Sequence, residues 1–187
     1  MVKRVEGFGK WVAIAGFTNA CIGDVEGLLS QVRGEFGDVA VQFFDARCIA
    51  GGEHLHFAVL NALRAFESGT NISKSLAVEC LLYASAQRQI KSALRLVGVR
   101  RGCSQIAVLV AADGKARVEE ALDRVSELIG GGRDDRVLEL LDDKVPAVLS
   151  LFGISDSELK AKLGRGEVKR AVAELVIEHV ALLAVQR

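Results

Sequence analysis

The chain has 187 residues, half of them hydrophobic, and its 24 Lys and Arg residues balance its 24 Asp and Glu residues. This length and composition predict one domain, residues 1–187, with a sizeable core. The balanced charge excludes a protein that is basic as a whole, so any site for an anion must come from a local cluster of cations.

The four cysteines lie more than twenty residues apart: Cys21, Cys48, Cys80 and Cys103. This spacing argues against a zinc site or a disulfide framework and predicts reduced thiols in the cytoplasm. No apolar run has the length of a membrane span and no signal-peptide pattern opens the chain, so no membrane partner is expected.

Two strands and a helix are predicted before residue 50. Residues 1–10 are polar and glycine-rich, and we expect an irregular arm there. The apolar run at 11–15 predicts a buried strand, and the β-branched and aromatic run at 39–44 predicts a second. Between them, apolar residues at helical spacing predict an amphipathic helix: Val25, Leu28, Leu29, Val32 and Phe36.

Three helices are predicted in succession between residues 51 and 98. The first has one apolar stripe that ends at Phe66. The second, at about residues 74–83, is apolar nearly all round except for Glu79. Because an unpaired buried carboxylate is costly, we expect Glu79 to pair with an arginine such as Arg88, unless it emerges on an exposed strip of its helix.

The third helix is predicted to begin near Ser85 and to end at Gly98, with its apolar residues inward: Ile90, Ala93, Leu94 and Val97. Three cations, Arg88, Lys91 and Arg95, recur along it at i, i+3 and i+7. A helix that opens at Ser85 would offer free backbone N–H groups and a positive dipole end to an anion. The cations are therefore either a phosphate-binding stripe or an ordinary solvated surface.

A stacking face for a base is a further requirement if the stripe binds single-stranded nucleic acid. Tyr83 and Phe57 are the two aromatic residues of the block that we expect to supply it.

A second strand–helix–strand pattern follows the block. Residues 105–110 give the clearest strand, residues 116–129 an amphipathic helix, and residues 137–140 a short fourth strand. Two such units predict an α+β (mixed α/β) fold, with a small four-stranded sheet, a three-helix insertion and a helical C-terminus.

The C-terminal part is predicted to be helical. Pro146 suits the first turn of a helix at 144–152, and Ser155 with Glu158 fits a capping box. From Glu167, a last helix has an apolar face wider than one packed side requires. Part of that face is expected to be covered by the core or by a partner.

The central block resembles a known family. The patterns HLxxAxxxA, GTNIxxSLxxExLLYAS and RQIxxALxxxG, with SELIGG at 126–131, are similar to the small kinase-binding subunit of the KEOPS complex, the PRPK-binding protein family, in an archaeal form. The resemblance extends over nearly the whole chain. The family pattern has glycine where this chain has Ala86.

The resemblance implies a non-catalytic regulatory subunit of KEOPS, the complex that makes threonylcarbamoyladenosine at position 37 of tRNA. It implies that the subunit binds the kinase/ATPase subunit, supports its activity, and helps to recruit tRNA through the 3′ CCA end. The tRNA-binding residues are then expected in the central block: Arg64, Lys74, Ser85, Arg88, Gln89, Lys91 and Arg95. The kinase-binding residues are expected on the last helix: Ala171, Leu175 and Leu182.

No catalytic constellation, metal site or phosphate loop stands out in the sequence, and no cofactor is expected. Cys48 with His54 would suit a thiol nucleophile and its base, and Glu53, His54 and His56 would suit a metal cluster. A small buried cysteine and polar residues at a helix start are the simpler interpretations. Two alternatives to a KEOPS subunit remain open: a free-standing RNA-binding module, and a small thiol enzyme that uses Cys48.

Overall fold

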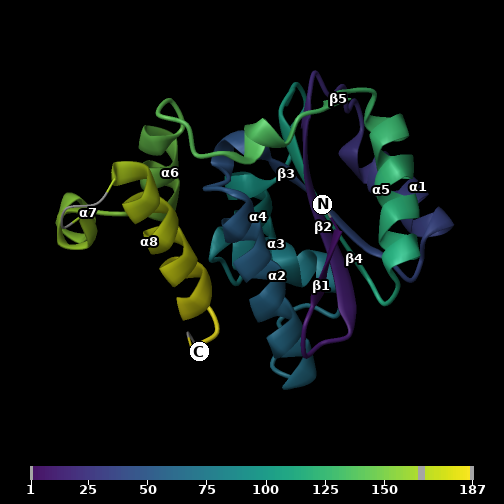
Figure 1. Cartoon of the computed structure of the whole chain (residues 1–187), viewed down its shortest axis with the longest axis horizontal. Coiled ribbons are helices and arrows are strands. Elements are labelled where there is room, and N and C mark those ends of the chain that lie inside the picture. Colours follow the sequence, from purple (N-terminus) through teal and green to yellow (C-terminus); the bar gives the residue numbers. More distant parts are fainter. Residues whose placement is uncertain (1, 164–166, 186–187) are drawn as a thin grey trace.

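The computed structural model of the protein describes residues 2–163 and 167–185. An antiparallel sheet forms its centre (Figure 1), with the order β1 (Val2–Val5), β2 (Lys10–Thr18), β4 (Ile106–Ala112) and β3 (Ala40–Asp45). A short strand, β5 (Gly132–Arg133), also pairs with β2. All seven residues of β4 are buried, because neighbouring strands flank it and helices cover both its faces.

β2 and β3 both run antiparallel to β4, so they are parallel to each other with β4 between them. Leu109 of β4 lies opposite Ile14 on one side and Gln42 on the other. The unit β2–α1–β3 is therefore a split strand–helix–strand motif whose central strand comes later in the chain.

Two amphipathic helices cover one face of the sheet: α1 (Val25–Glu35) and α5 (Lys115–Ile129). Asp24 caps α1, since its carboxylate accepts a hydrogen bond from the Gly27 N–H at 3.0 Å. The buried residues of α5 recur at steps of three and four, from Val118 to Ile129. Both helices pack with the sheet in one apolar cluster.

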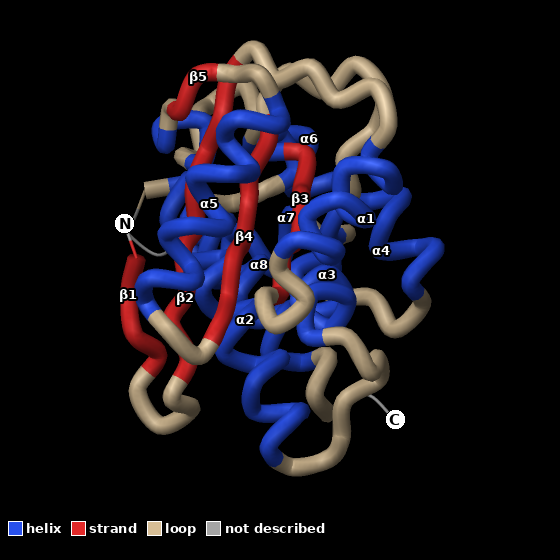
Figure 2. Tube along the Cα trace, turned by 90° about the vertical axis from the view of Figure 1, so that its right-hand side faces the viewer, coloured by secondary structure: helices blue, strands red, loops and turns tan. Residues whose placement is uncertain are grey.

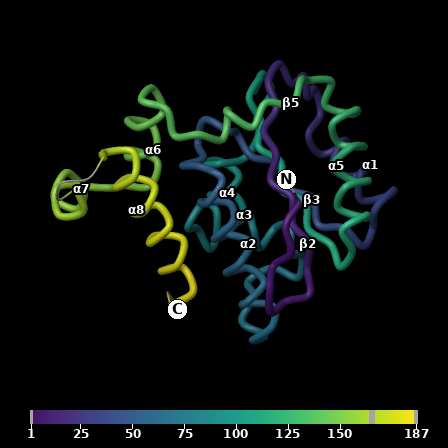
Figure 3. Tube along the Cα trace, viewed as in Figure 1, coloured from purple at the N-terminus to yellow at the C-terminus, as the bar shows by residue number. Residues whose placement is uncertain are grey.

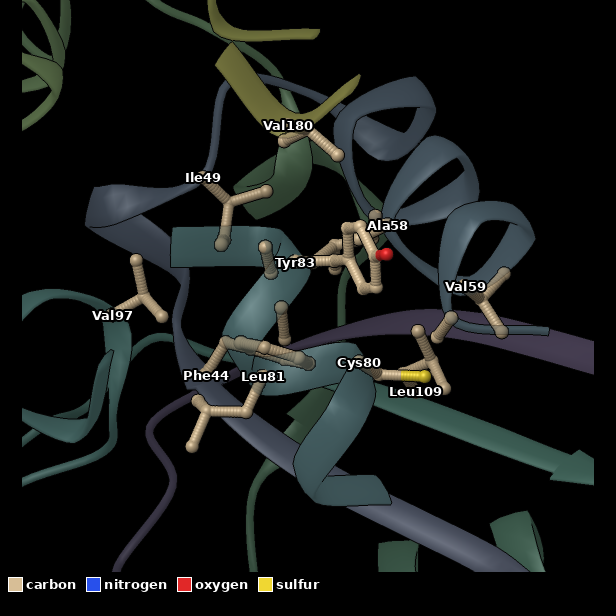
Figure 4. Close-up of a cluster of buried hydrophobic side chains, with 14 of the residues drawn as sticks. Phe44, Ile49, Ala58, Val59, Cys80, Leu81, Tyr83, Val97, Leu109 and Val180 are labelled. Carbon is tan, nitrogen blue, oxygen red and sulfur yellow. The ribbon is translucent and has the colours of Figure 1, made fainter. Parts of the chain in front are cut away.

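The opposite face carries α2 (Gly52–Glu67) and α3 (Leu76–Ser85), with α4 (Ile90–Val97) beside them (Figure 1). Figure 4 shows how this core is filled: Phe44 and Leu109 of the sheet face Leu81 and Cys80 of α3. Val180 enters the same cluster from the C-terminal helix. The three-helix insertion thus packs on the sheet as part of the main core.

A second helical layer lies beyond α2 and α3 (Figure 3). It contains α6 (Val145–Phe152), α7 (Asp156–Leu163) and α8 (Val168–Leu182), with a small apolar cluster of its own. Ser155 and Glu158 form the expected capping box, in which the Ser155 N–H donates to Glu158 Oε2 at 2.7 Å. No helix in the described ranges combines the length and apolar character needed to cross a membrane.

The α+β prediction is confirmed, but the sheet has five strands where four were predicted. Residues 2–5 pair with β2 and are not the irregular arm that was expected; residue 1 lies outside the described residues. The alternation in this stretch is short, with Val5 buried and Lys3 and Arg4 exposed. Such a brief pattern is easily taken for a polar arm.

The strand predicted at 137–140 is also wrong, because the chain forms a 3₁₀ helix, η2 (Asp135–Leu138), followed by irregular structure. The Asp134 carboxylate caps η2 by accepting the Arg136 N–H at 3.1 Å. Gly16 of β2 lets this turn approach closely, since a Cβ there would stand 2.6 Å from the Asp134 carbonyl oxygen. The Gly16 N–H instead donates to Asp135 Oδ1 at 2.9 Å.

Candidate functional site

The turn between α3 and α4 differs from the sequence prediction. Ser85 ends α3 and does not open a helix, and α4 begins only at Ile90. Ala86 adopts the left-handed conformation, with φ 51° and ψ 36°, at the position where the family pattern has glycine. The N–H groups of Ala86 and Gln87 then donate to the carbonyls of Tyr83 and Leu82, both at 3.0 Å.

This correction changes the electrostatics at Ser85. The residue lies at the carbonyl end of a helix, which carries the negative end of the dipole. Its side chain is buried, and its hydroxyl donates to the Leu82 carbonyl at 3.0 Å. The helix start predicted near Ser85 is therefore wrong, and the buried Ser85 hydroxyl is not presented to a phosphate.

The other predicted tRNA-binding residues are exposed. Arg88 and Gln89 lie in the turn, Lys91 and Arg95 on α4, Arg64 on α2, and Lys74 just before α3. Between residues 64 and 101 the chain has seven basic and two acidic residues, and one of the acidic residues, Glu79, is buried. We call the exposed side chains of Lys91 and Arg95, with Arg88, the basic face.

The end of the basic face at Arg95 is tied to the following chain. The Arg100 guanidinium Nη2 donates to the Arg95 carbonyl at 2.6 Å, which ties the chain after α4 to the end of the helix. Arg88 is also engaged in a contact within the protein. The face is consequently presented by a short helix whose C-terminal end is tied to the chain that follows it.

Ile90 and Leu94 do not face inward as predicted. Their side chains are 47% and 48% exposed, because α4 packs against the core through Ala93 and Val97, with Leu96 partly buried beside them. Since residues four apart share a side of a helix, Ile90 and Leu94 lie beside the row formed by Lys91 and Arg95. The exposed side of α4 is therefore both apolar and cationic, which suits a ligand with bases and phosphates.

The two expected stacking residues have different environments. Tyr83 is 4% exposed, and its side chain extends toward Ala58 of α2 inside the core (Figure 4). Burial raises the pKa of its hydroxyl above the usual value. Tyr83 is therefore a core residue and cannot stack with a base, whereas Phe57 on α2 is 36% exposed.

Glu79 is buried and paired, as predicted, but with the backbone in place of an arginine. Its carboxylate accepts the N–H groups of Ile72 and Ser73 at 3.1 Å and 2.7 Å. Glu79 thus fixes the connection between α2 and α3, including the stretch that presents Lys74.

His54 is a residue whose role the sequence did not indicate. It is fully buried, its Nδ1 accepts the Ala50 N–H at 3.2 Å, and its Nε2 lies 2.8 Å from the Ala84 carbonyl, which requires the proton on Nε2. Its ring meets Phe152 edge to face. Burial lowers the pKa of His54 to about 4, so the ring is neutral and joins the start of α2 to the end of α3.

The environment of Cys48 does not favour a reactive thiol. Burial, followed by the nearby Asp45 carboxylate, raises the pKa of Cys48 to about 11, and the thiolate is the nucleophilic form. His54 cannot act as its base, since both ring nitrogens are engaged. Within the described part of the chain, no three His, Cys, Asp or Glu side chains are grouped as metal ligands.

The wide apolar face of α8 is explained largely by the fold. Ala171 and Leu175 are only 5% and 6% exposed, because α8 packs on the main core on one side and on α6 and α7 on the other. Leu182 is 51% exposed. A partner can therefore reach Leu182 of the three predicted residues, while Ala171 and Leu175 hold the helix in place.

A cavity of about 310 Å³ brings together residues that were predicted for different partners. Its lining comes from the α3–α4 turn (Ser85, Ala86, Gln87), the end of α6 (Leu151, Phe152) and the end of α8 (His179, Leu182). A second hollow of about 330 Å³ is also lined by Leu182 and His179, and Glu158, Glu178 and Lys162 contribute to its wall. Leu182 thus stands between two depressions.

Comparison with known proteins places these surfaces in context. Residues 20–184 match the protein family described as "Kinase binding protein CGI-121". The chain is 32% identical over 160 residues to "Regulatory protein Cgi121" of Methanocaldococcus jannaschii, which covers 84% of this chain and 94% of that protein. It is 38% identical over 61 residues to "KEOPS complex subunit Cgi121" of Pyrococcus abyssi, or 33% of this chain and 34% of that protein.

Proposed function

The chain belongs to the CGI-121 family of kinase-binding proteins, and from this membership we propose that it is the regulatory subunit of a KEOPS complex that binds the kinase subunit. The family expected from the sequence is confirmed, and the prediction of a regulatory protein that is not an enzyme agrees with the family description. A cytoplasmic location and tRNA as a further partner complete the proposal.

The observation that supports a kinase-binding surface on α8 is the exposure of Leu182. Leu182 is a large apolar side chain, about half exposed, and it stands between two hollows. Apolar side chains that border pockets are typical anchors in protein interfaces. We therefore assign the kinase contact to the C-terminal end of α8.

Leu182→Glu tests this assignment. A charge at a desolvated anchor should weaken binding of the purified kinase subunit at least about tenfold, or 1.4 kcal/mol. Val168→Glu is the matched control, since Val168 is 45% exposed at the opposite end of the same helix. Kinase affinity is measured by titration calorimetry, and melting curves show that both variants are folded. Equal affinities for the two variants would place the kinase elsewhere.

The observation that supports tRNA recruitment is the basic face. It lies in a stretch with a strong excess of cations, in a chain without net charge. Ile90 and Leu94, which are exposed beside the basic face on α4, add apolar surface for unstacked bases. The 3′ CCA end of tRNA is single-stranded and presents both phosphates and free bases, so we assign this end to α4.

The double variant Lys91→Glu with Arg95→Glu tests the tRNA site. It should weaken binding of full-length tRNA by at least about tenfold, because repulsion is added to two lost contacts. Binding of tRNA trimmed of its CCA end should hardly change. With about four neutralised phosphates, the wild-type log–log slope with salt should be roughly −3.

Lys3→Glu with Arg4→Glu is the control for net charge. These two exposed cations lie on β1, at the opposite edge of the sheet from α4 (Figure 2). The control changes the total charge by the same amount and should leave tRNA binding close to wild type. If both double variants lose the same affinity, binding follows net charge and the basic face is not the site.

A further inference from the structure

Three helices end at the cavity below Leu182. Ser85 is the last residue of α3, Phe152 the last of α6, and Leu182 the last of α8. The carbonyl groups of a last helical turn lack intrahelical donors and carry the negative end of the helix dipole. Three such ends around one cavity make its interior attractive for positive charge.

Several carbonyls of these last turns already have hydrogen-bond partners. The N–H groups of Ala184 and Val185 donate to the carbonyls of Ala181 and Leu182 at the end of α8, and His54 Nε2 donates to the Ala84 carbonyl of α3. The N–H groups of Gly153 and Ile154 donate to the carbonyls of Ser150 and Leu149, at 3.3 Å and 3.0 Å. The caps of α3 likewise take the carbonyls of Leu82 and Tyr83. The lining residues of α3 and α6 follow these capped positions, and each carbonyl oxygen has two lone pairs for a donor.

The neighbouring hollow has the same preference for a cation. Glu158 and Glu178 contribute to its wall, and Glu158 Oε1 lies 3.9 Å from His179 Nε2. Lys162 lies there too, but its ammonium is shared between Glu174 and Glu178. Arg88, which follows the lining residue Gln87, is already engaged within the protein. Acidic side chains and helix ends therefore surround Leu182.

We propose that this cavity receives one arginine or lysine side chain of the kinase subunit. Leu151, Phe152 and Leu182 provide apolar walls for the aliphatic stem, and the last carbonyls of α3 and α6 would accept hydrogen bonds from the cationic head. This inference rests on the proposed kinase contact at α8 and adds the chemistry of the partner's anchor. The negative ends of the three helix dipoles disfavour a phosphate in the cavity.

The proposal also separates the two partners by charge. The basic face on α4 attracts an anion, while the cavity at the other end of the α3–α4 turn attracts a cation. The nucleic acid and the kinase should therefore bind at separate surfaces, since the charge of each surface disfavours the ligand of the other.

Charge variants of Gln87 test the proposal, because Gln87 lines the cavity and its backbone N–H bond to Leu82 is kept in every variant. Gln87→Lys should weaken kinase binding at least about tenfold, since an ammonium then competes for the cavity. Gln87→Glu should strengthen binding about threefold, and the uncharged Gln87→Met should stay within about twofold of wild type. Affinities are measured by titration calorimetry at low and moderate salt.

Two further measurements make the test specific. Gln87→Lys should bind full-length tRNA at least as well as wild type, which excludes unfolding as the cause of lost kinase binding. Exposed arginines and lysines of the kinase are also changed to Glu one at a time. One of these kinase variants should fail to bind the wild-type chain but should bind its Gln87→Lys variant.

Each alternative result overturns the proposal. Equal weakening by Lys and Glu would mean that the cavity takes a neutral group, and the reverse order would mean that it takes a carboxylate. No effect of either charge, together with loss of binding in Leu182→Glu, would keep the kinase contact and reject the cationic anchor. If the wild-type chain does not bind the kinase, the proposed function itself fails.

Discussion

The two faces of the sheet are covered in different ways. The face under α1 and α5 is covered by an apolar cluster, and charged pairs between these two helices are exposed at the rim, such as Arg124 with Glu35 at 2.8 Å. The face under α2 and α3 also contains buried polar side chains, among them His54 and Glu79. His54 bonds to the backbone at the end of α3, and Glu79 bonds to the backbone of the connection between α2 and α3.

The difference shows how the candidate surfaces are positioned. Apolar periodicity alone is sufficient to place α1 and α5, which carry no proposed site. On the other face, Glu79 fixes the connection that presents Lys74, and His54 fixes the end of α3 ahead of the basic face. Lys144 adds a third such contact, since its buried ammonium donates to the carbonyls of Ala46 and Val137.

The variant expected to have the largest effect on stability is Glu79→Leu. Loss of the carboxylate leaves the N–H groups of Ile72 and Ser73 without their acceptor, which should lower the free energy of unfolding by roughly 4 kcal/mol. Glu35→Gln is the comparison on the other face and should hardly move the denaturation midpoint, because Glu35 is solvated. Urea unfolding measures both, and similar losses would remove the distinction between the two faces.

The second test uses the pKa of His54, which burial lowers to about 4 from an ordinary value of 6.5. Between these two values the unfolded chain binds more protons than the folded protein, so stability falls as the pH falls from 6.5 to 4. The loss should reach about 3 kcal/mol at pH 4.

His54→Gln removes this titration. The variant should be less stable than wild type at pH 7, but its stability should fall much less between pH 6.5 and pH 4. Unfolding by urea at several pH values compares the two slopes. Parallel slopes would show that other groups cause the acid sensitivity.

The smallest expected effect concerns the turn after α3. Ala86→Gly should raise the free energy of unfolding by about 0.5 kcal/mol, because relief of left-handed strain exceeds the added flexibility of the unfolded chain. Ala84→Gly, two residues earlier within the helix, should instead lower it by about 1 kcal/mol. Thermal melts distinguish the two signs, and a destabilised Ala86→Gly would mean that the turn is not strained.

The helices and the three long strands could be predicted from the sequence because their apolar periodicity is regular. The start of α4 could not, since this chain has no glycine or proline between Tyr83 and Ile90 to mark the turn, and only the family pattern has glycine at the position of Ala86. The same error placed an anion site at Ser85. Exposure of Ile90 and Leu94 was missed because periodicity shows which residues share a side and not which side is covered.

Of the candidate sites, the sequence predicted the cations of the basic face and the exposed Leu182. It could not show that Ala171 and Leu175 are buried, because that depends on how α6 and α7 pack against α8. The cavity was also beyond prediction, since its walls come from three helices far apart in the chain.

The position of β4 has a consequence for how the chain is made. Leu109 pairs with both Ile14 and Gln42, yet it follows them beyond the whole three-helix block. During synthesis β2 and β3 cannot pair with β4 until β4 has left the ribosome. By then α2, α3 and α4 can already pack on one another. Closure of the long loops that join β2 and β3 to β4 should then limit the folding rate, and until that step the edges of β2 and β3 remain open to aggregation.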